Sequence, residues 1–249
     1  MVHHDSTHSV LIVMEFCSGG SISDFATHAH QESPDESAKA QVVEEKTIAH
    51  MCSCVSRALA IMHGEGIIHR DIKGANVLVS TNGAVKIADF GAAGVKRPGG
   101  VFHDAVGTPA WMAPEVCACD LPDGHSYDER CDVWSLGILA LELAEGKAPL
   151  FGEPGPTTIF AVPSNPPPTL KNEAVWSTRF KDFLLRALIK DYMLRPQIDE
   201  LQHHPLFVGF NENDMRKSVQ ASPHFGHLSI APTAARIAKV RPGSSGGTV

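Results

Sequence analysis

The segment His69-Arg70-Asp71-Ile72-Lys73-Gly74-Ala75-Asn76 brings an acid, a lysine two residues later and an amide five residues later into one short stretch. Phosphoryl transfer uses these three side chains together. Asp71 can orient an attacking hydroxyl and accept its proton, Lys73 can neutralise charge on the moving phosphoryl group, and an Asn76 oxygen can ligate Mg²⁺. We therefore take Asp71, Lys73 and Asn76 as candidate catalytic residues.

Two further segments follow at defined distances along the chain. Asp89-Phe90-Gly91 begins 13 residues after Asn76 and offers a second carboxylate, an oxygen ligand of the kind that Mg²⁺ prefers. Gly107-Thr108-Pro109-Ala110-Trp111-Met112-Ala113-Pro114-Glu115 begins 18 residues after Asp89. One such segment could arise by chance, but all three in this order and at this spacing match the signature set of eukaryotic protein kinases.

The chain resembles the C-terminal lobe of a eukaryotic serine/threonine protein kinase, with most of the N-terminal lobe absent. It is most similar to the sterile-twenty group, especially germinal-centre kinases and the kinase domain of class III myosins. The similarity covers about residues 10–208 and rests on residues 69–78, 107–116, 127–137, 163–168 and 195–196. It implies a mainly α fold with a small β-hairpin, built as a kinase large lobe plus the last N-lobe strand. The implied activity is ATP-dependent transfer of the γ-phosphoryl group to Ser or Thr of a protein substrate.

The resemblance also implies a nucleotide site, with ATP and Mg²⁺ as cofactors. Met14 resembles the gatekeeper, Glu15 and Cys17 resemble the hinge whose backbone meets adenine, and Leu78 resembles the floor of the adenine pocket. Cys17 could be a reactive hinge thiol, but an inert, partly buried cysteine is the preferred interpretation.

The resemblance assigns the catalytic roles in the same way. Asp71 corresponds to the catalytic base, and Lys73 to the phosphate-neutralising lysine typical of Ser/Thr kinases. Asn76 and Asp89 correspond to the Mg²⁺ ligands.

Other residues are expected to support this site. Thr108 belongs to the loop that receives the substrate hydroxyl residue, Glu115 and Arg195 are expected to form a buried ion pair beneath that loop, and Asp132 is expected to brace the catalytic loop. The remaining structural or regulatory candidates are His69, Arg70, Phe90, Gly91 and Asp104.

Asp104 is a candidate regulatory residue because its loop lacks a residue that could be phosphorylated. Residues 90–106 contain no Ser, Thr or Tyr, whereas sterile-twenty relatives carry an activating threonine three residues before the glycine that corresponds to Gly107. Counting back gives Asp104, or one of its neighbours if the loop is shifted by one residue. Our hypothesis is that Asp104 replaces the phosphothreonine and offers a permanent charge to Arg70, with weaker ordering because a carboxylate has less charge than a phosphate.

A complete kinase also has a Gly-rich loop, a strand lysine and a helix glutamate paired with that lysine. None of these precedes Met14, and Ala84-Val85-Lys86-Ile87 is only superficially similar to the lysine motif because it leads into Asp89. We expect residues 1–14 to be the last strand of an otherwise absent N-lobe, residues 15–208 the hinge and C-lobe, and residues 209–249 a flexible polar tail or linker.

The missing elements position the triphosphate, so we expect this chain alone to be nearly inactive. The alternative is a non-catalytic, pseudokinase-like interaction fragment. The expected partners are a protein substrate with Ser or Thr and either a scaffold protein or a protein that supplies an N-lobe.

Composition and charge argue against several other classes of protein. The 249 residues carry a net charge of −7, which argues against a protein that coats nucleic acid. The six cysteines lack zinc-site spacing and are interpreted as reduced thiols of a cytoplasmic protein. The polar N-terminus is not a signal peptide, and the apolar residues 133–143 are interrupted by Glu142 and fall short of the roughly 18 residues of a membrane span.

Hydrophobic periodicity predicts the main elements. Strands are expected over residues 9–16, 77–79 and 84–88, and helices from near Ser21, through 48–62, over 131–144 and 180–188, and from Pro196 to Leu201. The proline-rich residues 151–170 are expected to hold little regular structure.

Overall fold

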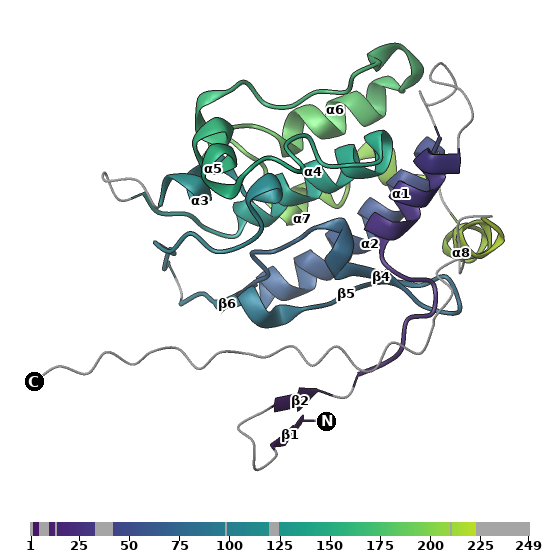
Figure 1. The fold of residues 1–249 in the computed structure, drawn as a ribbon, viewed down its shortest axis with the longest axis horizontal. Coiled ribbons are helices and arrows are strands. Elements are labelled where there is room, and N and C mark those ends of the chain that lie inside the picture. The colour runs from purple at the N-terminus through teal and green to yellow at the C-terminus, as the bar shows by residue number, and fades with distance from the viewer. Residues whose placement is uncertain are drawn as a thin grey trace, which may run out of the picture.

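Helix α4 (Arg130–Glu145) forms the centre of the fold (Figure 1). Every residue from 131 to 144 is buried, as expected for a segment that is apolar nearly all round. The helix ends at Gly146, whose φ of 78° is the left-handed conformation that glycine adopts most readily at a helix C-terminus. The computed structural model describes residues 2–4, 10–12, 14–32, 42–97, 99–119, 125–209 and 211–222.

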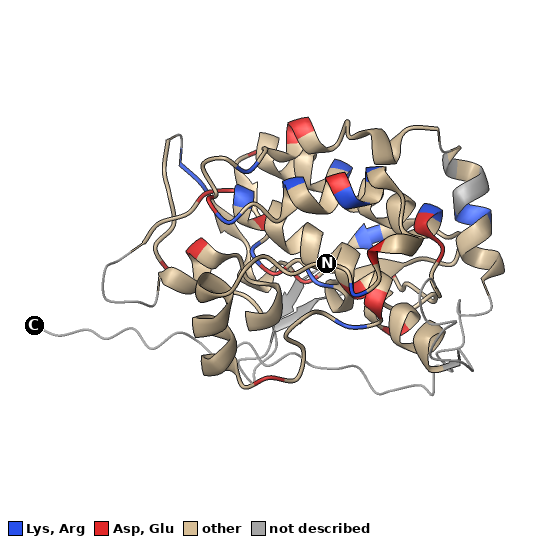
Figure 2. Cartoon of the chain, turned by 90° about the horizontal axis from the view of Figure 1, so that it is seen from above, with Lys and Arg blue, Asp and Glu red and all other residues tan. Residues whose placement is uncertain are grey.

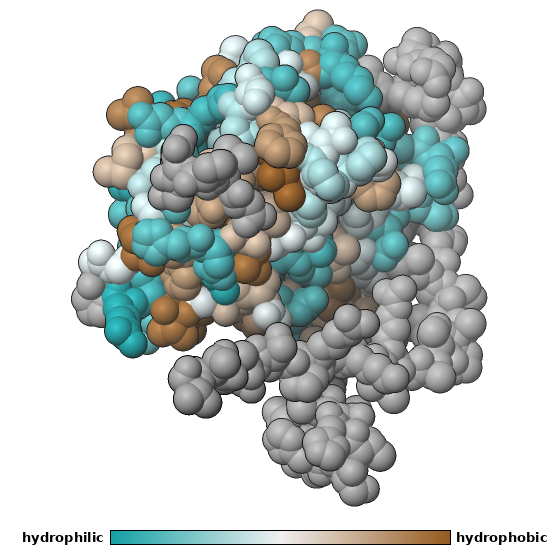
Figure 3. Space-filling model, turned by 60° about the vertical axis from the view of Figure 1, so that its left-hand side comes forward, coloured by the Kyte–Doolittle hydropathy of each residue, from teal (hydrophilic) through white to brown (hydrophobic). Residues whose placement is uncertain are grey.

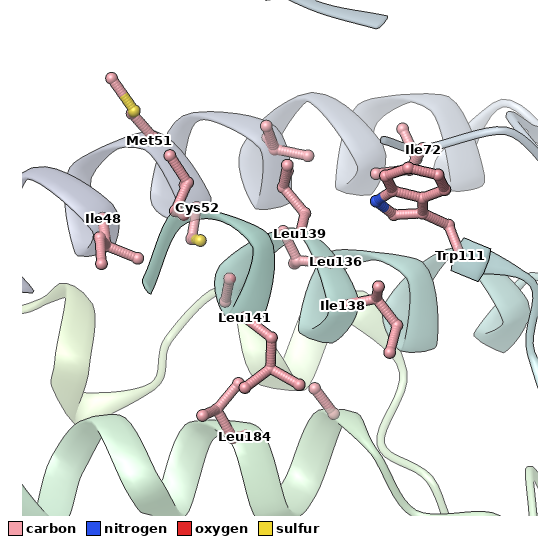
Figure 4. Packing of buried hydrophobic residues seen from close by; sticks show 14 of the residues in the cluster. Ile48, Met51, Cys52, Ile72, Trp111, Leu136, Ile138, Leu139, Leu141 and Leu184 are labelled. Atoms are coloured by element: carbon pink, nitrogen blue, oxygen red, sulfur yellow. The ribbon is translucent and has the colours of Figure 1, made fainter. Parts of the chain in front are cut away.

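Two helices cover α4 from opposite sides, as Figure 4 shows. Ile48, Met51 and Cys52 recur at helical spacing on α2 (Glu45–Gly64), and Leu184 lies on α6 (Thr178–Ala187). Helices α2 and α6 bury their apolar faces against the same central helix. Helix α4 therefore supports the loops that follow α2 and α6.

The remaining helical elements surround these three. The α-helices are α1 (Ile22–Glu32), α3 (Pro114–Ala118), α5 (Gly155–Ser164), α7 (Ile198–Leu201) and α8 (Glu212–Ala221). Short 3₁₀ turns are η2 (Gly74–Asn76), η3 (Phe90–Ala92), η4 (Pro109–Trp111), η5 (Glu173–Val175) and η6 (Pro205–Phe207).

The described strands form three antiparallel pairs. They are β1 (Val2–His4) with β2 (Val10–Ile12), β3 (Ile67–Ile68) with β6 (Gly94–Val95), and β4 (Val77–Val79) with β5 (Val85–Ile87). The turn at Thr81-Asn82-Gly83 joins β4 to β5, as the sequence predicts, and Gly83 has a φ of 75°. The mainly helical fold with a small β-hairpin is therefore confirmed.

The prediction of little regular structure over residues 151–170 is wrong. Residues 155–164 form α5, with Pro156 in its first turn and Pro163 one residue before its end. Proline is tolerated in the first turn, where its missing N–H has no intrahelical partner, so only Pro163 lies unfavourably.

The segment predicted to be a flexible tail is in part a helix. Residues 212–221 form α8, and Val219 is fully buried against the rest of the lobe. The Gln220 side chain donates to the Thr81 carbonyl at 2.7 Å, which ties α8 to the turn between β4 and β5. Residues 223–249 lie outside the described residues.

The visible surface mixes positive with negative residues and apolar with hydrophilic residues. Lys and Arg are interspersed with Asp and Glu along the visible elements (Figure 2), and apolar residues lie among hydrophilic ones on the face shown in Figure 3. None of the six cysteines, all of which lie among the described residues, forms a disulfide. Within the described part of the chain, no helix has the length and apolar character needed to cross a bilayer.

Candidate active site

The Asp71 carboxylate accepts hydrogen bonds from three side chains. Thr108 Oγ1 donates to Oδ1 at 2.6 Å, while Lys73 Nζ and Asn76 Nδ2 donate to Oδ2 at 2.7 and 2.9 Å. Lys73 Nζ also donates to Thr108 Oγ1 at 2.6 Å. The fold thus gathers the three predicted catalytic residues and Thr108, which is 37 residues from Asp71, around one carboxylate.

Asp132, at the start of α4, holds the backbone of this loop. The His69 and Arg70 amides donate to its carboxylate at 2.9 and 2.8 Å, and His63 Nε2 donates to it at 2.8 Å. Arg70 has a φ of 67°, a conformation that costs energy for a residue with a side chain. The hydrogen bonds that the Asp132 carboxylate accepts from the His69 and Arg70 amides hold Arg70 in this conformation.

The β4–β5 hairpin brings Asp89 beside the catalytic loop. Its register places Val77 opposite Ile87, and the Ala88 amide donates to the Asn76 carbonyl at 2.8 Å. His69 Nε2 donates to the Ala88 carbonyl at 3.2 Å and fixes the same region from the other side. The catalytic loop that ends at Asn76 and the segment that begins at Ala88 are therefore held side by side, although they are separate in the sequence.

The oxygens of Asn76 and Asp89 fit a magnesium ion. Asn76 uses its Nδ2 atom on Asp71, so its Oδ1 atom is the side-chain atom left to serve as a ligand. Asp89 is exposed, and only its Oδ1 atom accepts a hydrogen bond that the structure shows, from the Gly91 amide at 3.2 Å. Mg²⁺ is commonly held by one or two protein oxygens together with substrate phosphates. No group of three or more His, Cys, Asp or Glu suited to a metal occurs among the described residues, so this site would need the phosphates as further ligands.

The predicted hinge residues lie along the hairpin. The Gly19 amide donates to the Val79 carbonyl at 2.9 Å, and Lys86 pairs with Glu15. Met14 is 62% exposed, and burial together with the charge of Glu15 raises the pKa of the Cys17 thiol, which disfavours a reactive thiolate.

Leu78 and Phe90 are two further residues that the resemblance singles out. Leu78 is half-buried in β4 and forms an isolated antiparallel bridge with Ser21. Phe90 packs edge-to-face on His69, with ring centroids 5.4 Å apart, but remains 54% exposed. An aromatic ring with this degree of solvent exposure is a surface that a segment of another protein could cover.

Arg70 and Asp104 are in contact. Arg70 Nη1 lies 3.0 Å from both carboxylate oxygens of Asp104, and Arg70 also stacks over Phe102 at 4.7 Å. The Tyr127 hydroxyl donates to the Asp104 carbonyl at 3.0 Å and accepts from Arg70 at 3.3 Å. Burial alone would lower the pKa of Arg70, but Tyr127 and Asp104 raise it, so the guanidinium stays charged.

Glu115 and Arg195 form the predicted buried pair. Arg195 Nη1 and Nη2 donate to the two Glu115 oxygens at 2.6 and 3.0 Å. Arg195 is 1% exposed and also donates to the carbonyls of Arg130 and Ile189 at 2.9 and 2.8 Å. The pair joins α3, whose first two residues are the last two of the Gly107–Glu115 motif, to the segment before α7.

Sequence reasoning missed three residues that the site uses. His63 donates to Asp132, Tyr127 joins Arg70 to Asp104, and Glu142 contacts both loops around Asp71. For Glu142 a signal was present, because an acid in the middle of an apolar helix needs buried partners. His63 and Tyr127 gave no comparable signal, since their spacing from their partners has no local pattern.

The helical lobe and this arrangement of Asp71, Lys73, Asn76 and Asp89 define the large lobe of a protein kinase. Comparisons with known proteins agree, because the family model "Protein kinase domain" matches residues 2–207. The chain belongs to the protein kinase family.

Its relatives include members of the sterile-twenty group. Rat Misshapen-like kinase 1 is 41% identical over 214 residues, which are 86% of this chain and 15% of the relative. The Caenorhabditis elegans serine/threonine-protein kinase mig-15 is 43% identical over 195 residues, 78% of this chain and 17% of the relative. Human Myosin-IIIa is 38% identical over 216 residues, 86% of this chain and 13% of the relative. The chain is thus a serine/threonine protein kinase by resemblance, and it spans less than a fifth of the length of these three relatives.

Proposed function

We propose that this domain transfers the γ-phosphoryl group of ATP to Ser or Thr hydroxyls of a protein substrate. The observation that carries the proposal is the Asp71 carboxylate, which is held by Lys73, Asn76 and Thr108 at 2.6 to 2.9 Å. Such a carboxylate is oriented before substrate arrives, which is what general-base catalysis requires.

Each residue has a role that follows from its contacts. Asp71 orients the substrate hydroxyl and accepts its proton, and Lys73 places a positive charge beside the transferring group. Thr108 binds both and aligns the substrate loop with the base. Asn76 and Asp89 would hold Mg²⁺, which when bound neutralises charge on the phosphates.

The proposal includes low activity for the 249-residue chain by itself. Its sequence contains no Gly-x-Gly-x-x-Gly followed by Val, and its only Val-Lys-Ile segment lies in β5. A phosphate loop and a strand lysine do much of the triphosphate positioning in kinases. The absence of disulfides among the six cysteines, together with an expected protein substrate, supports a cytoplasmic protein that acts on other proteins.

The function is tested by incubating Mg-ATP and a generic protein substrate with two proteins. One is the 249-residue chain, and the other is the same chain joined to the N-lobe of mig-15. We expect phosphoserine or phosphothreonine from the joined protein and little product from the chain alone.

Vigorous phosphorylation by the chain alone would contradict the impairment. A joined protein that melts cooperatively and binds Mg-ATP, yet transfers nothing, would instead favour a non-catalytic interaction module. The exposed Phe90 and Met14 side chains are the observation that supports this second function.

We further propose that Asp104 orders its loop without phosphorylation. Replacing Asp104 with Asn should remove the charge that binds Arg70. Amide exchange over residues 101–106 should become only about threefold to tenfold faster, since the Asp104 side chain is 56% exposed. Hydrogen-exchange mass spectrometry measures this effect, and the joined protein should lose activity in parallel.

Asp199→Asn, at an exposed position of α7, is the matched control for Asp104→Asn because it removes the same charge away from the loop. Equal exchange rates in the two variants would show that Asp104 does not anchor the loop. Unchanged activity of Asp104→Asn would remove its regulatory role.

A further inference from the structure

Helix α8 is a part of the lobe to which the proposed reaction gives no role. It follows the other described helices along the chain, yet it lies beside the turn that joins β4 to β5 (Figure 1). Most of its described side chains are exposed, but Val219 is fully buried and belongs to the hydrophobic core. A polar helix that buries an apolar side chain in this way is docked at a defined place, so its contacts show which segments it can influence.

The turn between β4 and β5 is shaped to receive α8. Gly83 is buried although it lies in a turn, and its φ is 75°. A Cβ atom at this position would lie 2.5 Å from the Arg216 carbonyl oxygen of α8, far inside van der Waals contact. Glycine therefore allows both the left-handed conformation of the turn and the close approach of the helix backbone.

Thr81, in the same turn, connects α8 to the hinge segment, which we define as residues 15–20. The Thr81 carbonyl accepts the hydrogen bond from Gln220 Nε2 at 2.7 Å. The Thr81 hydroxyl is hydrogen-bonded to the hydroxyl of Ser18 at 3.0 Å. Thr81 thus contacts the C-terminal helix with its backbone and the hinge segment with its side chain.

Two backbone hydrogen bonds continue this connection from the hinge segment to β4. The Gly19 amide donates to the Val79 carbonyl at 2.9 Å, and the Val79 amide donates to the Gly20 carbonyl at 2.9 Å. The next pair along the strand is the bridge between Leu78 and Ser21. The hinge segment therefore runs along the edge of β4, beside the residue that resembles the floor of the adenine pocket.

The side of α8 that faces α1 and α2 is loosely packed. A hollow of about 350 Å³ lies between Ser218 and Ala221 of α8 and the side chains of Phe25 and Thr47. Atoms that line a hollow lack part of the dispersion contacts that a packed interface would supply. The attachment of α8 therefore depends strongly on Val219 and on the turn between β4 and β5.

We propose that α8 positions the nucleotide-binding hinge, because it holds Thr81 against Ser18 and so keeps the hinge segment paired with β4. The inference rests on the function proposed above, in which the hinge backbone meets the adenine of ATP. Thr81 and Gln220 are positioning residues, which act on the nucleotide through the hinge rather than on the base Asp71.

Three substitutions separate the docking of α8 from the connection to the hinge. Val219→Asp places a charge in the buried site and should undock the helix. Gln220→Ala removes only the hydrogen bond to Thr81, whereas Thr81→Val removes the hydroxyl that binds Ser18 and keeps the shape of the side chain. Asn213→Asp is the matched control for Val219→Asp, because it adds the same charge at an exposed position of α8.

The first measurement is amide hydrogen exchange by NMR on the full 249-residue chain, which needs no catalytic activity. In Val219→Asp and in Thr81→Val, the Gly19 and Val79 amides should exchange about threefold to tenfold faster, the effect expected when one hydrogen bond no longer stabilises the segment. Asn213→Asp should exchange at the native rate.

The Ala88 amide is the internal reference for this measurement. It donates to the Asn76 carbonyl at 2.8 Å, at the end of the β4–β5 hairpin that lies away from the turn. A local effect on the hinge leaves its exchange unchanged, whereas a general loss of stability would accelerate it together with the Gly19 amide.

The second measurement is phosphoryl transfer by the chain joined to the N-lobe of mig-15. Val219→Asp and Thr81→Val should raise the KM for ATP about threefold or more and leave kcat within about twofold, because the hinge binds the nucleotide but does not contact the reacting groups. A variant that only folded less completely would lower the apparent kcat and leave the KM for ATP unchanged. The control Asn213→Asp should keep both constants at the native values.

Three results would overturn the proposal: unchanged Gly19 exchange in Val219→Asp, equal acceleration of the Gly19 and Ala88 amides, or an unchanged KM for ATP in both Val219→Asp and Thr81→Val. If Val219→Asp does not fold, Gln220→Ala decides, because it should still accelerate Gly19 exchange by about threefold. An unchanged rate in that variant overturns the proposal. If the native joined protein transfers nothing, the proposed function fails, and the exchange data still show whether α8 holds the hinge segment.

Discussion

Replacing Arg195 with Met should lower the free energy of unfolding by about 3 to 5 kcal/mol, the largest stability effect that we expect from one substitution in this chain. The variant leaves the buried Glu115 carboxylate without its two donors at 2.6 and 3.0 Å. It also leaves the carbonyls of Arg130 and Ile189 without their partner. Urea denaturation followed by circular dichroism measures the change.

The double variant Glu115→Met with Arg195→Met is the control for this prediction. It removes both charges, so it should recover part of the lost stability, because the penalty comes mainly from an unpaired buried charge. Glu145→Met serves as a reference for a carboxylate in a partly exposed surface pair. If Arg195→Met costs no more than this reference, the pair does not stabilise the lobe.

Asp71→Asn should reduce phosphoryl transfer by about 10²-fold to 10⁴-fold, the range expected when a general base is removed. The substitution keeps the size of the side chain and an acceptor for one of its donors, so the loop should remain folded. It cannot accept the proton of the substrate hydroxyl. We expect kcat to fall in the chain joined to an N-lobe, with little change in the KM for ATP.

Two comparisons make the Asp71 prediction specific. Asp199→Asn changes an acid far from the proposed base and should leave kcat unchanged. The melting temperature of Asp71→Asn should stay within a few degrees of the native value, about what a change of 1 kcal/mol produces in a domain of this size. A kcat close to that of the native protein would show that Asp71 is not the base.

The proposed reacting groups could be identified in the sequence because they lie within short motifs. Asp71, Lys73 and Asn76 fall within six consecutive residues, and the hairpin that carries Asp89 has a recognisable turn. Helix α4 was equally predictable, since a 14-residue segment that is apolar nearly all round is typical of a buried helix.

Other features needed the folded chain. Helix α5 was missed because proline content suggested irregular structure, although one proline lies in the first turn, where it is tolerated. Helix α8 was missed because its sequence is polar and only Val219 is fully buried among its described side chains. In both cases packing against neighbouring elements outweighs a weak local preference.

The sequence by itself determined which chemical groups make up the proposed phosphoryl-transfer site, because those groups lie at fixed spacings within short motifs. Only the tertiary structure decided how those groups are held. Glu142 meets Ser23, Gly74 and Trp111 across 119, 68 and 31 residues, and no local pattern encodes such distances. Those contacts form because α1, α4 and the two loops bury their apolar surfaces together, and burial then requires each enclosed polar group to have a partner.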